Sequence, residues 1–147
     1  MRIVFTAPDG ATSIMTPAPQ ADVARVLPEV KDMTEQQYIE FIRDRDVPAG
    51  STNISIVDDS AIPKDRTFRS ALRHDLTFDV DQCVEITKER LRREREPLLA
   101  ALDTKYIRAI EDGTPTAPIV AEKQRLRDIT NAAHAGLSLD ELKALKA

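Results

Sequence analysis

The sequence predicts an α+β fold, in which a small N-terminal antiparallel β-sheet with short helices precedes a long C-terminal antiparallel helical hairpin. Residues 2–6 and 12–16 are rich in β-branched and other apolar side chains, and a Pro-Asp-Gly turn signal lies between them, so they predict a β-hairpin. Residues 53–57 alternate polar and apolar side chains, which is typical of a further strand. From residue 81 onward the apolar side chains recur at spacings of three, four and seven, which predicts long helices.

The N-terminal part needs more than its hairpin, because an isolated hairpin is marginal in water. We therefore expect the strand at 53–57 to pair with it and complete a three-stranded sheet. A short helix is expected over 20–27, where a proline follows. A second helix is expected over 35–45, because Thr34 and Gln37 have the spacing of a capping box at its start.

The C-terminal part begins with one long predicted helix, 81–111, with Asp81 as its N-cap. Pro97 lies inside this helix and is expected to kink or divide it, because proline lacks a backbone N–H and its ring clashes with the preceding turn. Gly113 suits the position after the helix end, and Thr114 is the expected N-cap of the next helix.

The second long helix is expected to run to about residue 129 and to pack antiparallel to the first, because the connection between them is short. The side chains expected in this contact share one helical face: Leu91, Leu98, Leu102, Ile119, Val120 and Leu126. A last short helix is expected to begin at Ser138, where Glu141 completes a capping box. The predicted domains are therefore 1–79, a small α+β domain, and 80–147, the helical hairpin with the short C-terminal helix.

Composition excludes several classes of protein. The net charge is −4, which disfavours general nucleic-acid binding. No apolar run approaches the ~20 residues that cross a bilayer, so no membrane partner is expected. The single cysteine, Cys83, cannot form an internal disulfide, which fits synthesis in a reducing cytoplasm.

The sequence also predicts that the protein is not an enzyme and holds no cofactor. Cys83, His74 and His134 lack the spacing of metal ligands, and we interpret them as a core cysteine and two surface histidines. No nucleophile has a flanking signature, and the four glycines are too scattered for a phosphate-binding loop. The paired carboxylates at 58–59 and at 79 and 81 are explained as turn and cap residues.

Residues 88–96 carry the densest charge and allow three interpretations. Arg90, Arg92, Arg93 and Arg95 would form a basic stripe that binds nucleic acid, or a patch that faces a protein partner. Glutamates alternate with these arginines, so the favoured interpretation is a solvated helix face with ion pairs such as Glu89–Arg93.

The segment 63–73 joins the two predicted halves and is expected to contain a short helix over 65–73. Arginine and aromatic side chains are favoured interface anchors, so the segment is a candidate protein-binding site. Its candidate partner-binding residues are Arg66, Phe68, Arg69 and Arg73. In the alternative interpretation, Phe68 packs under the sheet and the arginines brace carboxylates of Asp58, Asp59 or Asp79.

Several stretches together resemble small proteins from the tail gene modules of tailed bacteriophages and prophages, described as hypothetical, tail or tail-assembly proteins. These stretches are MRIVFTAPDG at the N-terminus, then PAPQ, IPKDRTFRSALR, VDQCVEITKERLRREREPLLAALDTKYIRAIEDG and EKQRLRDIT. The resemblance covers most of the chain and is weakest over residues 28–50. The QRLRDI run is also similar to the end of tail-fibre assembly chaperones.

The resemblance implies a non-enzymatic virion protein of the tail or fibre-attachment apparatus, made in the host cytoplasm, and it transfers no catalytic residues. Its implied partners are other tail or fibre proteins and further copies of itself, because helical hairpins can form coiled coils between subunits. One alternative is an assembly chaperone that does not stay in the virion. A second alternative is a small nucleic-acid-binding regulator that uses the arginine-rich helix.

Overall fold

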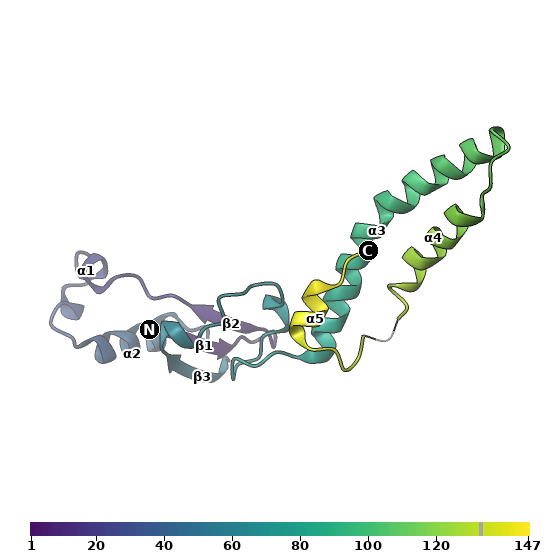
Figure 1. Cartoon of the computed structure of the whole chain (residues 1–147). Coiled ribbons are helices and arrows are strands. Elements are labelled where there is room, and N and C mark those ends of the chain that lie inside the picture. Colours follow the sequence, from purple (N-terminus) through teal and green to yellow (C-terminus); the bar gives the residue numbers. More distant parts are fainter. Residues whose placement is uncertain (133) are drawn as a thin grey trace. The chain divides into compact units, whose positions relative to one another are not determined.

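The predicted fold class is confirmed in a computed structural model, which describes residues 1–132 and 134–147. A three-stranded antiparallel sheet lies in the N-terminal part, and a long helix followed by two shorter ones forms the C-terminal part (Figure 1). The chain divides into two compact units, Met1–Phe78 and Asp79–Ala147. Each unit has its own buried side chains and is described separately below.

The sheet of the first unit has β1 (Arg2–Thr6) at its centre, between β2 (Thr12–Met15) and β3 (Thr52–Val57). Both pairs are antiparallel. The turn between β1 and β2 is closed by two backbone hydrogen bonds, from Gly10 N–H to the Ala7 carbonyl and from Ala7 N–H to the Ala11 carbonyl, both 2.8 Å. Gly10 has φ +87°, a left-handed conformation that this turn requires and that glycine adopts without strain.

One face of the sheet is covered by α2 (Glu35–Asp46), which begins with the predicted capping box. The core between helix and sheet contains Ile3, Phe5, Val30, Tyr38, Ile39 and Ile42. The short α1 (Gln20–Val23) ends earlier than the predicted 20–27. The chain continues as a tighter turn, in which the N–H groups of Arg25 and Val26 bond to carbonyls three residues back. Pro28 then excludes Leu27 from the helical region, and Leu27 has φ −124° and ψ 85°.

The opposite face of the sheet is covered as well, because Val4 points away from Ile3 and Phe5 along β1 and is fully buried. The segment after β3 does not form the predicted helix over 65–73, and only two short 3-10 turns occur there, Asp59–Ala61 and Arg69–Ala71. Asp65 accounts for the difference, because its carboxylate accepts hydrogen bonds from the Thr67 N–H at 2.9 Å and from the Thr67 hydroxyl at 2.6 Å. Such local side-chain bonds hold the backbone in a turn instead of a helix.

The second unit is built on α3 (Val80–Glu111), and its N-cap is Asp79 and not the predicted Asp81. The Asp79 carboxylate accepts from the Gln82 N–H at 3.0 Å, three residues on, as an N-cap does. Pro97 does not divide the helix.

The connection to α4 (Ala117–Asp128) differs from the prediction, because the N-cap of α4 is Thr116 and not Thr114. Thr114 instead belongs to the end of α3. Its N–H bonds to the Ala109 carbonyl at 2.8 Å, and Gly113 N–H bonds to the Ile110 carbonyl at 3.2 Å. These two bonds form a Schellman motif around Gly113, which has φ +65°.

The short α5 (Leu139–Ala144) begins with the predicted capping box of Ser138 and Glu141. Within the unit, α3 contacts both α4 and α5, and Figure 1 shows α5 beside the first part of α3. The largest fully buried side chains in this unit are Leu91, Leu126 and Leu142.

The predicted helix contact is confirmed only in part. Leu91 and Leu126 are buried, Leu102 and Ile119 are half-buried, and Leu98 and Val120 are 44 % and 49 % exposed. Four of the five buried residues of α3 lie between Cys83 and Leu91, in the part of the helix beside α5. Farther along, α3 packs against one neighbouring helix instead of two, so its apolar side chains there stay partly exposed to solvent. His134 was predicted at the surface and is instead buried, with its Nε2 2.8 Å from the Ile129 carbonyl oxygen.

Candidate functional site

A cleft of about 490 Å³ opens on the N-terminal unit between β2 and the segment that follows β3. Strand β2 and its neighbours provide one wall, and residues 59–78 provide the other. The lining residues are Arg2, Thr12, Ser13, Ile14, Thr16, Asp59, Ile62, Pro63, Lys64, Asp65, Arg66, Arg69, Leu72 and Phe78.

The apolar part of the cleft consists of Ile14, Ile62, Pro63, Leu72 and Phe78. Leu72 and Phe78 are joined by an antiparallel β-bridge across a tight turn. Leu76 in this turn has φ +64°, a left-handed conformation that costs a leucine roughly 1–2 kcal/mol. The strained residue thus lies in the turn that brings two side chains of the cleft side by side.

One corner of the cleft is electrically balanced. The guanidinium of Arg2 binds the Asp59 carboxylate through two hydrogen bonds of 3.1 Å, and it also donates to the Thr16 hydroxyl. The Met1 ammonium group, 3.2 Å away, and Arg2 hold the pKa of Asp59 below its usual range. Asp59 was a predicted brace for the arginines of the 63–73 segment, and it pairs with Arg2 instead.

The other side of the cleft carries an excess of positive charge, because three cationic side chains and one carboxylate, that of Asp65, line it. Lys64, Arg66 and Arg69 are exposed and line the cleft. Among the residues that the structure describes, no hydrogen bond or ion pair engages any of these three cationic groups. Asp65 lies between Lys64 and Arg66 in the sequence, and its carboxylate accepts hydrogen bonds from Thr67. The cleft thus offers two guanidinium groups and an ammonium group to an external ligand.

The cleft brings together two of the four candidate partner-binding residues. Arg66 and Arg69 line it, whereas Arg73 is exposed outside the lining. Phe68 is only 3 % exposed, so in this structure it packs inside the unit and is not accessible to a partner. The sequence interpretation missed the wall formed by β2, in particular Ile14. The alternation along the hairpin was the available signal, because it places Ile14 and Met15 on opposite faces of the sheet.

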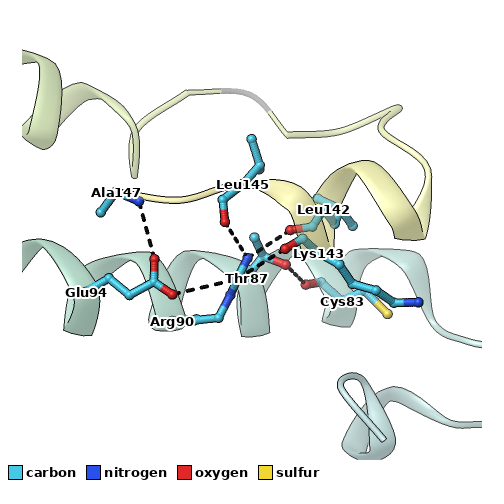
Figure 2. A network of polar contacts seen from close by, with 8 residues as sticks. All are labelled: Cys83, Thr87, Arg90, Glu94, Leu142, Lys143, Leu145 and Ala147. Carbon is cyan, nitrogen blue, oxygen red and sulfur yellow. Dashed lines mark hydrogen bonds and ion pairs between the residues drawn. The ribbon is translucent and has the colours of Figure 1, made fainter. Parts of the chain in front are cut away.

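The arginine-rich stretch 88–96 of the second unit has a different role. Figure 2 shows the Arg90 guanidinium bonded to three carbonyl groups at the end of α5: Leu142 and Leu145 at 2.9 Å and Lys143 at 3.3 Å. Glu94 faces Arg90 at 3.6 Å and accepts a hydrogen bond from the Ala147 N–H. Arg90 therefore caps the C-terminus of a helix more than fifty positions away in the sequence.

Arg95 likewise binds the end of another helix. It donates hydrogen bonds to the carbonyl of Arg127, in the last turn of α4, and to the hydroxyl of Thr130, which follows α4. The predicted solvated face is therefore wrong for Arg90 and Arg95 and holds for Arg92 and Arg93, which are exposed. The predicted Glu89–Arg93 ion pair is not formed between those two described residues, and the helix has an Arg90–Glu94 pair instead.

The described residues form no metal cluster and no membrane span. Nowhere in 1–132 or 134–147 do three or more His, Cys, Asp or Glu side chains gather as metal ligands would. Within the same residues, no helix combines the length and apolar character needed to span a membrane. Cys83 is fully buried, and burial, together with the Asp79 charge, raises the pKa of its thiol, which lowers its nucleophilicity.

The cationic cleft is the arrangement with the clearest capacity to bind a ligand. Its lining combines apolar side chains with cationic groups that have no partner among the described residues, and such a surface suits a ligand that is both apolar and acidic. No protein-family model, no curated protein and no solved structure matches this chain.

Proposed function

We propose that this protein works by binding another protein through the cationic cleft of its N-terminal unit, as a non-enzymatic virion component of the tail or fibre-attachment apparatus of a bacteriophage. One observation supports the binding role above all: Arg66 and Arg69 line the cleft without an internal partner among the described residues. Exposed side chains without an internal partner contribute little to the stability of the unit. Contacts with another molecule would explain why two arginines lie here.

The residue types that line the cleft, and the charge of the whole chain, favour a protein ligand. Arginine is enriched in protein interfaces because its planar guanidinium binds carboxylates through two hydrogen bonds while its flat faces pack against apolar groups. The apolar side chains Ile14, Leu72 and Phe78 in the same cleft provide contacts of that second kind. A net charge of −4 counts against a nucleic-acid ligand, since the long-range field of the chain repels phosphate.

The assignment to a phage tail rests on the resemblance in sequence. The stretch IPKDRTFRSALR, residues 62–73, is one of those that carry the resemblance. It also supplies most of the charged lining of the cleft, including Lys64, Arg66 and Arg69. The same surface would serve a tail assembly chaperone, so the two roles differ in whether the protein stays in the particle.

The test is a double substitution, Arg66→Ala with Arg69→Ala, in the full chain, produced from the phage or prophage that encodes it. We expect the melting temperature to stay within about 1 °C of the parent, because neither side chain braces the fold. Mass spectrometry of purified particles should find the parent at a fixed copy number, and the double variant should be depleted at least tenfold. Arg92→Ala with Arg93→Ala is the matched control, since both side chains are exposed arginines outside the cleft.

The outcomes separate the candidate roles. A parent chain that is absent from particles but bound to a tail protein in the lysate would establish the assembly chaperone. Salt-sensitive binding to nucleic acid would favour the regulator. A parent chain that neither enters particles nor binds a tail protein would refute the proposal.

A further inference from the structure

We propose that the ligand of the cleft is an extended, acidic segment of the partner, which adds to the free edge of β2 as a fourth strand and places its carboxylates against Arg66 and Arg69. This inference rests on the proposed protein-binding function and specifies the chemistry of the partner. Three features of the N-terminal unit carry it: an unpaired strand edge, cationic groups beside that edge, and an apolar floor.

The first feature is the edge itself. In the order β2-β1-β3 strand β2 has a neighbour on one side only. The hydrogen bond from Ala7 N–H to the Ala11 carbonyl fixes which residues face β1, because bonded and non-bonded pairs alternate along an antiparallel ladder. From that pair onward the bonded pairs are Phe5 with Ser13 and Ile3 with Met15.

The backbone N–H and carbonyl groups of Thr12 and Ile14 consequently point away from β1, toward the open edge. Among the described residues, no backbone hydrogen bond joins this outer edge to another segment. Natural sheets protect such edges with lysine, proline or inward-pointing charge. Strand β2 is short, with four residues, but its sequence Thr-Ser-Ile-Met contains no lysine, proline or charge, so its edge is open to the addition of a strand.

The second feature is charge. Lys64, Arg66 and Arg69 line the same cleft as Thr12 and Ile14 of the edge strand. A segment that pairs with β2 therefore runs past these cations, and carboxylates on it gain charge-assisted hydrogen bonds. An acidic segment is the complement of this surface, whereas a basic one would be repelled.

The third feature is the apolar floor formed by Ile14, Leu72 and Phe78. Side chains on an added strand alternate between the two faces of the sheet, so residues two apart both face the cleft. In a segment that fits, one apolar side chain packs against the floor of the cleft, and an aspartate or glutamate two positions away pairs with the arginines. Apolar alternation of this kind is how strand-addition sites obtain specificity beyond backbone pairing.

A second copy of this chain is a poorer occupant. Symmetric pairing of β2 with β2 would bring Lys64, Arg66 and Arg69 of one copy toward the same residues of the other, and like charges facing each other across a ladder are destabilising. Nucleic acid offers no backbone N–H or carbonyl groups that could continue a β-ladder.

The test begins with a library of displayed nine-residue peptides of random sequence, selected on the full-length folded chain. We expect the enriched peptides to carry Asp or Glu at alternate positions with an apolar residue between or beside them. An enriched peptide made with Gln and Asn in place of its acids should bind at least tenfold more weakly. No enrichment, or enrichment of peptides without acids, would overturn the inference.

Two variants of the protein then separate the contributions of charge and edge. Arg66→Gln with Arg69→Gln should weaken an enriched peptide at least tenfold, with Arg92→Gln and Arg93→Gln as the matched control. Thr12→Pro removes one outward N–H without removing a bond to β1, so it should also weaken the peptide while the melting temperature and the amide spectrum of β1 remain close to the parent.

Hydrogen exchange of individual amides provides a readout that does not depend on a variant. Saturation with an enriched peptide should protect the Thr12 and Ile14 amides of the parent protein from hydrogen exchange at least tenfold. Protection confined to other segments would overturn strand addition, and a peptide-induced dimer would point to a second copy as the occupant.

The two proposals fail in distinguishable ways. If enriched peptides leave β2 unprotected while incorporation into particles still depends on Arg66 and Arg69, only the strand addition is wrong. If acidic peptides protect β2 and no tail or fibre protein binds the chain, the proposed phage function is wrong and the site remains.

Discussion

The hydrogen bonds of Arg90 to the end of α5 make a quantitative prediction about the C-terminal unit. Arg90→Met keeps an unbranched apolar stem of similar length to that of arginine and removes the guanidinium. The parent side chain is 29 % exposed, and its guanidinium makes three hydrogen bonds to carbonyl groups. Since α5 has only six residues, it is too short to persist without tertiary support.

The magnitude follows from these contacts. A hydrogen bond to a charged group contributes about 1.5–3 kcal/mol, and the three bonds share one partly exposed guanidinium, so we expect a total loss of about 2–3 kcal/mol and not three full contributions. The loss should appear first as local opening of α5. A loss of about 2–3 kcal/mol would make hydrogen exchange of the α5 amides roughly 30- to 150-fold faster.

The assay is hydrogen exchange of the Leu142 and Leu145 amides, which bond to Ser138 and Glu141 within the helix. Arg93→Met is the control, because Arg93 is an exposed arginine of the same helix. A change of less than twofold for Arg90→Met, or a change equal to that of the control, would refute the role of Arg90 as a helix cap.

Three further predictions concern the same unit. Leu126→Ala should lower the free energy of unfolding by about 2–5 kcal/mol, because Leu126 is 1 % exposed, whereas Val120→Ala at 49 % exposure should cost less than about 1 kcal/mol; urea denaturation compares the two. The thiol of Cys83 should resist a thiol-specific reagent at pH 7 until the unit unfolds, because it is buried and its pKa is raised mainly by burial, and fast labelling of the native protein would contradict this. Hydrogen bonds from Ser138, mainly from its backbone N–H and also from its hydroxyl, lower the pKa of Glu141. The capping box should therefore stabilise α5 at a pH above the ordinary glutamate pKa, and this stabilisation should be lost as the pH falls through the lowered pKa. Glu141→Gln should remove this pH dependence of α5 amide exchange, and an unchanged profile would show that another group is responsible.

The elements that could be predicted from the sequence are those fixed by neighbouring residues. The β1–β2 hairpin and both capping boxes depend on residues no more than a few positions apart, and they form where predicted. The start of α4 was misplaced because Thr114 satisfies a carbonyl of α3 instead of capping the next helix. Both threonines near this turn have the right chemistry for a cap, and only the backbone geometry distinguishes them.

The candidate site was predicted in part. Arg66 and Arg69 stood out from their density of charge, and the structure places them beside a cleft. The burial of Phe68 was one of the two interpretations open from the sequence, and choosing between them depends on how the chain after β3 folds back. The alternation along β2 places Ile14 on one face of the sheet, but it does not tell which segment lies opposite. Arg90 and Arg95 were misjudged for the same reason, since their partners lie in segments far along the sequence.

The central position of β1 has a consequence for the order in which the chain is made. Its partner β2 follows within a few residues, but its other partner lies much later, as the pairing of Arg2 with Val57 shows. At ribosomal speeds of about 5–20 residues per second, the intervening stretch takes roughly 2–8 s to synthesise. During that interval the second edge of β1 has no strand to pair with, while its apolar side chains await the helix that will cover them. Slower translation between the codons of β2 and β3 would lengthen this exposure of the nascent N-terminal hairpin.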